Sequence, residues 1–466
     1  MTQSPMNKAL HRLVLSFLIL PPMAALAEPA SSFGCEALDT SPLPSVEGSD
    51  GVFYRVQSDL RLQHPMDDII VARLAELSRV LAEHGTTLVY VNVPTKGQAM
   101  PDDLPAGAIG YGYDPVLMDA NYLDVIDRLN AAGVAAPDLM TAMKAAADGI
   151  GVFFRSDFHW TPDGARLAAQ AIGAVIRNHP AYNDVTPVAF TSTETGPEIA
   201  FSGMRRELQT QCKDSLPQAE AATWLTTRTD AAGPVTDATD IFADAPATAE
   251  GAAPDATVDI FGTNAAEATL VLVGTSFSDT DINNFAGFLS EYSGIETINY
   301  AITGGNQFGS ITSYLTSREF TEKRPNFLVW ENPIYNSLAQ FGPTAMDELI
   351  AAAGNTCDIA TTSAADGPQT IAADFPTGSL KSTDTLLFDF GNEGARGINI
   401  TLQTASGITR TVRIDRGERL RATGRFFLRL APYWLPDITR VAVEFDRPLL
   451  DGSAILLCPP SKGDAS

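Results

Sequence analysis

An aspartate and a histidine lie two residues apart in segment 155–162, which reads Arg-Ser-Asp-Phe-His-Trp-Thr-Pro. A carboxylate beside an imidazole is two thirds of a catalytic triad, because the carboxylate fixes the tautomer of the ring and stabilises the imidazolium. Of the five histidines in the chain, only His159, with Asp157 before it, has such a setting. The alternative interpretation is a polar turn that caps the next helix, with Trp160 packed beneath it.

A serine at the end of a predicted strand offers the third member of a triad. Ser276 follows the apolar run 269–273 and the turn residues Gly274 and Thr275. A serine hydroxyl is a weak nucleophile at neutral pH and needs a base to take its proton. Many strands end in serine, so Ser276 alone indicates little, but together with Asp157 and His159 it predicts covalent catalysis through an acyl-serine.

A second strand-end turn could supply donors for an oxyanion. Gly304, Gly305 and Asn306 follow the predicted strand 296–300 and offer backbone N–H groups and a side-chain amide. We predict that Gly305 and Asn306 serve in this way. A tight turn that needs positive φ explains the glycines equally well.

Hydrophobic periodicity places these residues on an alternating series of strands and helices. The pattern predicts strands at 87–93, 269–273, 296–300 and 326–330, and helices at 65–85, 120–132, 136–148, 162–178, 283–292 and 310–317. Thr161 is the expected N-cap of the 162–178 helix, with Pro162 at its first position. Such alternation predicts an α/β domain with a mostly parallel sheet. The turns of Lys96, Ser276, Asn306 and Asn332 would then lie at the carboxyl edge of that sheet, where functional groups gather.

The hydrophobic pattern of the sequence changes after Cys357. Five short alternating runs at 386–390, 398–402, 411–414, 426–430 and 441–445 predict an all-β sandwich. Segment 213–267, rich in Ala, Thr, Asp and Pro, reads as a long loop or excursion with short strands. We therefore divide the chain into 1–27, 28–350 and 351–466.

The first 27 residues have the pattern of a secretory signal peptide. Lys8 and Arg12 precede an apolar run at 13–20, and Ala-Leu-Ala at 25–27 is a small-x-small cleavage site. The run is too short to span a bilayer. The pattern predicts a chain that is exported and begins near Glu28.

The four cysteines fit export, because they show no metal-binding spacing and their number is even. Two disulfides can be connected in three ways. Sequential pairing, Cys35 with Cys212 and Cys357 with Cys458, would fasten each domain separately. Unpaired buried thiols are the alternative.

The chain carries a formal net charge of −25. Such a charge disfavours nucleic acid and anionic membranes as partners. It also disfavours a polyanionic substrate, unless cations such as Lys96, Arg155, Arg318 and Arg425 gather into a basic groove. A neutral polymer is the other possibility.

These segments together resemble the SGNH hydrolase superfamily, and within it the permuted branch of periplasmic alginate O-acetyltransferases typified by AlgX. In this branch the Asp-x-His segment precedes the nucleophile. The resemblance covers nearly the whole chain after residue 27. It rests on Val-Pro-Thr-Lys-Gly at 93–97, Asp-Phe-His-Trp-Thr-Pro at 157–162, Gly-Thr-Ser-Phe-Ser at 274–278, Asn-Phe-Ala-Gly-Phe-Leu at 284–289 and Trp-Glu-Asn-Pro at 330–333.

The resemblance implies a flavodoxin-like sheet domain and a C-terminal carbohydrate-binding module. It implies a periplasmic monomer that needs no cofactor or metal and acetylates an anionic or neutral polysaccharide, with an acetyl donor passed on by a membrane acetylation complex. Ser276 would carry the acetyl group, His159 would be the base and Asp157 its orienting partner. Tyr335 falls where the family has a substrate-lining tyrosine, although a packed aromatic is an equally good interpretation. Tyr433 and Trp434, with Arg425 and Arg429, could bind sugar, but core packing suits most of these aromatics better.

Two other functions use the same features. An acetyl esterase would run the same triad with water as the acceptor. A non-catalytic polysaccharide-binding scaffold of an export complex would need no triad, so the presence of Ser276, His159 and Asp157 disfavours it.

Overall fold

A parallel four-stranded sheet forms the centre of the α/β part of the molecule. The structure, a computed structural model, describes residues 31–62, 64–146, 151–229, 268–342, 344–354 and 357–458. The strands follow the order β3 (Thr87–Val93), β8 (Phe327–Pro333), β6 (Thr269–Val273) and β7 (Glu296–Asn299). Every residue of β3, β6 and β8 is buried, as expected for strands with helices on both faces.

Alternate strand residues divide the core into two layers. Leu88, Tyr90 and Trp330 belong to one layer, whereas Val89 and Val329 belong to the other. The first layer packs under α1 (Asp68–Glu83), α3 (Pro115–Ala131), α9 (Asn306–Leu315), α10 (Arg318–Glu322) and α11 (Thr344–Gly354). The second packs under α4 (Leu139–Lys144), α5 (Pro162–Asn178) and α8 (Phe285–Ser293). The predicted α/β class with a parallel sheet is confirmed.

Two antiparallel sheets share a separate core in the C-terminal part. The five-stranded sheet has the order β10 (Ser363–Ala365), β11 (Thr370–Asp374), β16 (Ile438–Phe445), β13 (Gly397–Thr404) and β14 (Thr409–Asp415). The four-stranded sheet has the order β15 (Arg425–Arg429), β12 (Thr385–Asp389), β17 (Ala454–Cys458) and β9 (Ile359–Ala360). Phe388 and Phe426 from one sheet pack with Ile400 and Val443 from the other. The predicted C-terminal all-β sandwich is therefore present, while the proposed domain boundary at residue 350 stays a prediction.

Smaller elements surround the carboxyl edge of the parallel sheet. They are the hairpin of β1 (Ser45–Glu47) and β2 (Phe53–Arg55), the hairpin of β4 (Phe190–Ile199) and β5 (Glu220–Arg228), and the helices α2 (Lys96–Ala99), α6 (Gly203–Gln209) and α7 (Ser276–Asp279). Strand β5 corrects part of the 213–267 prediction. It has nine residues and pairs along the length of β4, so it is no short strand in a loop. Residues 230–267 lie outside the described part.

The disulfides have the sequential pairing. Cys35 is bonded to Cys212, and Cys357 to Cys458. The first bond ties the N-terminal segment to the chain just after α6, and the second ties the chain after α11 to β17. Each disulfide therefore stays within one part of the molecule.

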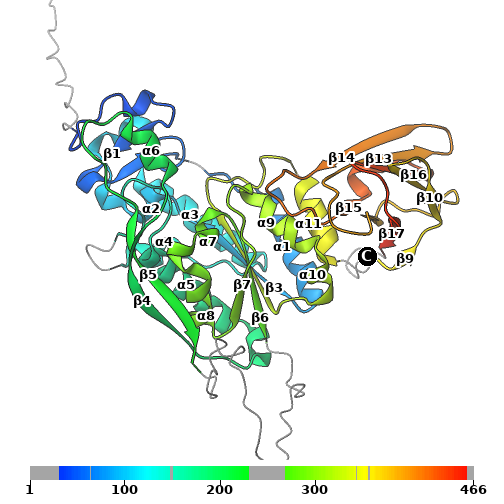
Figure 1. Cartoon of the computed structure of the whole chain (residues 1–466), viewed down its shortest axis with the longest axis horizontal. Coiled ribbons are helices and arrows are strands. Elements are labelled where there is room, and N and C mark those ends of the chain that lie inside the picture. Colours follow the sequence, from blue (N-terminus) through cyan, green and yellow to red (C-terminus); the bar gives the residue numbers. More distant parts are fainter. Residues whose placement is uncertain are drawn as a thin grey trace, which may run out of the picture.

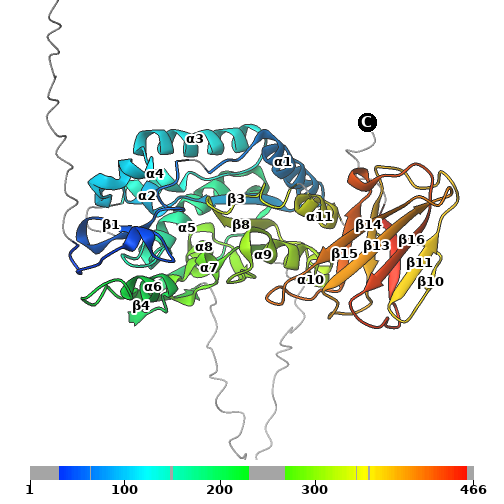
Figure 2. The same cartoon turned by 90° about the horizontal axis from the view of Figure 1, so that it is seen from above.

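The two parts lie side by side in an elongated molecule (Figures 1 and 2). Helices α1, α10 and α11 face the four-stranded antiparallel sheet, and a buried ion pair between Glu348 on α11 and Arg416 crosses the junction at 2.6 Å. Among the described helices, none has the length and apolar character needed to cross a membrane. The predicted signal peptide lies outside the described residues.

Candidate active site

Asp157 and His159 lie on a short turn that leads into α5. An isolated bridge between Phe153 and Trp160 closes the turn, and the Phe154 N–H donates to the His159 carbonyl at 3.1 Å. The alternative interpretation was that this turn caps the helix that follows. In the structure Thr161 caps α5, because Thr161 Oγ1 accepts from Gly164 N–H at 3.2 Å. Asp157 and His159 are therefore free for another role.

A continuous hydrogen-bonded chain joins the turn to Ser276. His159 Nε2 lies 2.7 Å from Ser276 Oγ, and His159 Nδ1 lies 2.6 Å from Asp157 Oδ1. Ser276 is the first residue of α7, and only Gly274 and Thr275 separate it from the end of β6. Asp157 is buried, whereas His159 and Ser276 are partly exposed, so the nucleophile can be reached from solvent. This geometry permits transfer of the Ser276 proton to the imidazole.

The second carboxylate oxygen of Asp157 is held by Ser202. Ser202 Oγ donates to Asp157 Oδ2 at 2.5 Å and also caps α6 by accepting from Arg205 N–H. Burial alone would raise the pKa of Asp157, but the hydrogen bond and charge of His159, followed by the Ser202 bond, outweigh it and lower this pKa to about 2. Asp157 is therefore a carboxylate at neutral pH.

The turn that carries Ser276 is fixed by a buried glutamate from β8. Glu331 Oε2 accepts from Thr275 N–H at 2.7 Å and from Ser278 Oγ at 2.9 Å, and Glu331 Oε1 accepts from Thr275 Oγ1 at 3.1 Å. Burial raises the pKa of Glu331 to about 7, although these donors oppose the shift. A Cβ atom at Gly274 would lie 2.4 Å from Glu331 Oε2, so this close approach requires glycine.

The family model of the SGNH hydrolase-like domain of acetyltransferase AlgX matches residues 46–334. This range includes every residue of the hydrogen-bonded chain just described. The chain belongs to the AlgX family.

Relatives of the AlgX family align over much of this chain. The alginate biosynthesis protein AlgX of Pseudomonas aeruginosa is 29% identical over 296 residues, which cover 63% of this chain and 56% of the relative. AlgX of Pseudomonas putida is 26% identical over 430 residues, covering 87% of this chain and 83% of the relative. The probable alginate O-acetylase AlgJ of P. aeruginosa is 32% identical over 288 residues, covering 60% of this chain and 67% of that protein.

The fold of this AlgX-family chain matches a solved structure. The structure of P. aeruginosa AlgX superposes with a TM-score of 0.70 at 21% sequence identity, covering 93% of this chain and 98% of the other. The match extends through both parts of the molecule. It shows that the arrangement of sheet domain and C-terminal antiparallel sheets is shared.

Aromatic side chains pack the two halves of the candidate site together. Trp160 Nε1 donates to the Phe277 carbonyl at 2.9 Å, which ties the acid–base turn to the serine turn. The Arg55 guanidinium lies 4.3 Å from the Phe158 ring centroid and 4.6 Å from that of Tyr335. Tyr335 is thus brought beside the turn that carries His159, and its substrate-lining role stays a prediction. Burial raises the pKa of Tyr335 to about 12, against the opposing effect of Arg55.

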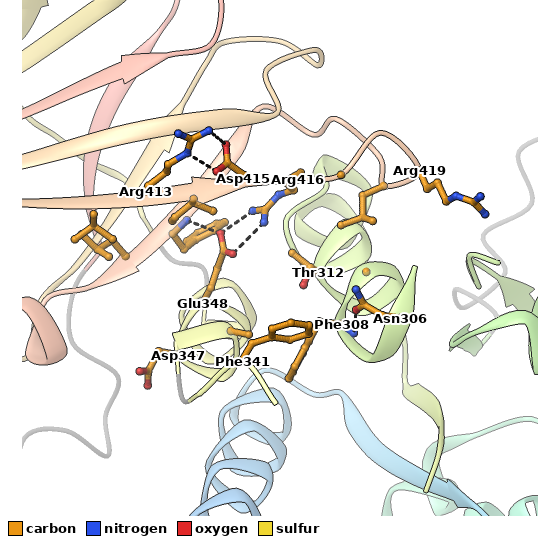
Figure 3. A pocket seen from close by; sticks show the side chains of 18 of the residues that line it. Asn306, Phe308, Thr312, Phe341, Asp347, Glu348, Arg413, Asp415, Arg416 and Arg419 are labelled. Atoms are coloured by element: carbon orange, nitrogen blue, oxygen red, sulfur yellow. Dashed lines mark hydrogen bonds and ion pairs between the residues drawn. The ribbon is translucent and has the colours of Figure 1, made fainter. Parts of the chain in front are cut away.

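Gly305 and Asn306 make no hydrogen bond to the triad within the described residues, so their predicted oxyanion role stays a prediction. The Gly305 N–H already donates to the Ile302 carbonyl at 3.0 Å, and Asn306 Oδ1 accepts from Phe308 N–H at 3.0 Å. Gly304 has a φ of +75°, as the tight-turn interpretation of the glycines expected, and Asn306 has a φ of +53°. Asn306 lines a different pocket of about 450 Å³, between α9 and the chain after β14 (Figure 3).

The four cations considered for a basic groove do not gather at one place. Lys96 is buried against backbone carbonyls. Arg318 pairs with Asp389, and Arg425 is buried at the junction, where it donates to Thr321 Oγ1. Arg155 is exposed.

The aromatic pair suggested for sugar binding packs against the sandwich core. Tyr433 and Trp434 are partly buried there, and Tyr433 also lines the pocket of Figure 3. Arg429, suggested with them, pairs with Glu76 on α1 at 2.6 Å. Core packing accounts for most of this group.

Sequence reasoning missed three residues that complete the site: Ser202, Arg55 and the buried carboxylate of Glu331. Ser202 is 45 residues from Asp157, and its only local signal is that of a helix cap. Arg55 lies in a three-residue strand with Asp59 four residues later, and no sequence pattern connects that pair to His159. Glu331 was singled out as part of Trp-Glu-Asn-Pro, and its burial at the end of a strand was the available clue.

Proposed function

We propose that this chain transfers acetyl groups to hydroxyls of a polysaccharide. The observation that carries the proposal is the hydrogen-bonded chain from Ser276 through His159 to Asp157. His159 Nε2 would take the proton from Ser276 Oγ while the oxygen attacks the carbonyl carbon of the donor, and would give that proton to the leaving group as the acetyl–donor bond breaks and an acetyl-serine forms. His159 would then take the proton of a sugar hydroxyl as that oxygen attacks the acetyl-serine, and would return the proton to Ser276 Oγ as the acetyl–serine bond breaks.

We further propose alginate, through its mannuronate residues, as the acceptor. The names of the AlgX and AlgJ relatives support this assignment. The net charge of −25 and the dispersed cations weigh against a polyanion and keep a neutral polysaccharide as the competing substrate. High salt would relax this repulsion, because the Debye length falls to roughly 3 Å at about 1 M.

The setting of the reaction follows from the same proposal. We propose a periplasmic monomer, exported by a signal peptide at 1–27, that receives acetyl groups from a donor passed on by a membrane acetylation complex. Residues 351–466 would act as a carbohydrate-binding module that holds the polymer beside the sheet domain. Its attachment to α1 and α11 supports this arrangement, because a polymer bound to the module would keep a fixed position relative to the triad.

The test is an acceptor assay with mass spectrometry. The protein is incubated with p-nitrophenyl acetate as donor and a mannuronate oligomer or a neutral oligosaccharide as acceptor. The expected product is an oligomer heavier by one acetyl group, absent with Ser276→Ala. Acetate release from the donor with no gain on any oligomer would instead identify an esterase.

The scaffold alternative is tested in cells. Ser276→Ala should abolish acetylation of the polymer and leave its export unchanged. Loss of export with acetylation retained would identify a binding scaffold.

A further inference from the structure

Lys96 is a fully buried lysine beside the acid–base turn. Its side chain extends from the start of α2, and the residue is only 1% exposed. Lys96 Nζ donates to four backbone carbonyls: Phe53 at 2.9 Å, Phe154 at 2.5 Å, Arg155 at 2.7 Å and Asp157 at 3.1 Å. Three of these carbonyls belong to the turn that carries Asp157 and His159.

The surroundings of Nζ favour an ammonium group. An ammonium group has three N–H donors, and four carbonyl oxygens surround it. A neutral amine would have two donors and would direct its lone pair at a carbonyl oxygen. The contacts therefore fit the charged form, even though burial of a charge is costly.

Charged groups around Lys96 affect the pKa of its ammonium group in opposite directions. Asp59, Asp157 and Asp103 favour the ammonium, Arg55 opposes it, and the Tyr54 ring centroid lies 5.6 Å from Nζ. Burial is the largest influence and lowers the pKa of Lys96 to about 7. The ammonium form of Lys96 therefore predominates below about pH 7.

Other hydrogen bonds hold the same turn beside those of Lys96. The Phe53 N–H donates to the Arg155 carbonyl at 2.8 Å. This bond joins β2 to the same turn to which Lys96 donates. Ser202 holds the Asp157 carboxylate from the opposite side. Lys96 therefore connects α2, β2 and the turn at one point.

We propose that Lys96 is a positioning residue whose ammonium group holds Asp157 and His159 in line with Ser276. The inference rests on the proposed function, since it assigns Lys96 to the triad of that function. Lys96 itself touches neither donor nor acceptor. A merely structural lysine would support folding without affecting the reactivity of Ser276 in folded protein.

The test measures the reactivity of Ser276 without any acetyl donor or sugar. Methanesulfonyl fluoride is added to the whole protein. Ser276 Oγ attacks sulfur, the O–S bond forms, fluoride leaves and His159 takes the hydroxyl proton. The second-order rate of labelling is followed by mass spectrometry from pH 5 to pH 9, with Ser276→Ala as the unlabelled control. Because no acetyl transfer is involved, failure of the proposed function and failure of this inference are distinguishable.

Lys96→Met keeps the length of the side chain and removes the ammonium. We expect labelling of folded protein to slow by about a hundredfold, because a displacement of about 1 Å can have an effect of that size. The pH midpoint of labelling should also move upward by about half a unit, since removal of a positive charge beside the triad makes protonation of the triad easier. Lys144→Met is the matched control, because Lys144 pairs with Asp119 near the surface. It should label at the wild-type rate.

Lys96→Gln covers the case in which Lys96→Met does not fold. A glutamine amide still donates two hydrogen bonds but carries no charge. We expect labelling about tenfold slower than wild type, with the same upward move of the pH midpoint. A folded Lys96→Met or Lys96→Gln protein that labels at the wild-type rate with an unchanged pH midpoint would overturn the proposal.

Discussion

At the scale of single residues, the candidate site depends on how Asp157 is kept ionised. Both of its carboxylate oxygens accept hydrogen bonds, from His159 on one side and from Ser202 on the other. The pKa of Asp157 is lowered to about 2 although the residue is buried. The carboxylate can therefore orient the imidazole over the whole neutral range of pH.

Asp157→Asn should lower Ser276 reactivity by about a thousandfold, because an amide does not select the correct imidazole tautomer. It should also change the pH dependence of stability. A folded-state pKa below the usual value contributes stability that is present above the unfolded pKa and is lost as pH falls through the folded pKa. The difference between about 3.8 and about 2 corresponds to about 2 kcal/mol.

Urea unfolding measured between pH 6 and pH 2.5 tests this prediction. The wild type should lose about 1.5 kcal/mol more than Asp157→Asn over that interval, because the rest of the difference is lost only below the folded pKa. Parallel pH profiles for the two proteins would contradict the role assigned to Asp157.

At the scale of elements, the ends of parallel strands bring the site together. The end of β6 leads to Ser276, and the neighbouring β8 supplies Glu331 beneath it. This edge could be predicted from the sequence, because buried apolar runs and polar turns identify parallel strands and their carboxyl ends. The helix starts were less exact: α3 begins at Pro115 because Asp114 accepts from Val116 N–H and Leu117 N–H, five residues before the apolar pattern suggested.

Glu331→Gln tests the contribution of β8. The folded-state pKa of Glu331 is raised to about 7, so the folded state binds more protons than the unfolded state between about pH 4.5 and 7. The free energy of unfolding should therefore fall as pH rises through that interval. In Glu331→Gln this contribution should be absent, while the amide keeps an acceptor for Thr275 N–H. Chemical unfolding at pH 5 and pH 8 measures the difference, and equal falls in the two proteins would refute it.

Side-chain contacts across long stretches of chain could not be predicted from the sequence. Ser202 reaches Asp157 because α6 folds back over the turn, and the Cys35–Cys212 disulfide holds the end of α6. Periodicity indicates the face that a helix buries but not which distant turn it meets. The oxyanion role of Gly305 and Asn306 stays a prediction for the same reason, because a strand-end turn can face a neighbouring domain as easily as the triad.

At the scale of the whole molecule, ion pairs fasten the β-sandwich to the sheet domain. Arg416 pairs with Glu348 where both side chains are almost buried, and Arg429 pairs with Glu76. A buried pair with one partner removed leaves an uncompensated charge, which costs about 3–5 kcal/mol. The stability of the junction between the two parts therefore depends on these ion pairs.

Arg416→Met should lower the free energy of unfolding by about 3 kcal/mol. Arg413→Met is the control from β14, three residues before Arg416, since Arg413 pairs with Asp415 on an exposed face and should change stability by less than about 1 kcal/mol. Urea unfolding of both variants measures the contrast. Equal effects would show that the junction does not depend on Arg416.

Strand β3 has consequences for how the molecule is made. It lies at one edge of the parallel sheet, and its only partner strand in the described sheet is β8, with Thr87 opposite Phe327. At about 5–20 residues per second, synthesis of the chain between them takes on the order of ten to fifty seconds. During that time the described part of the growing chain holds no partner strand for the seven residues of β3, all of which are buried in the finished protein, and offers only an isolated bridge between Val89 and Ala135. A chain stopped before Phe327 would keep that edge open, and it would be a substrate for chaperones and proteases.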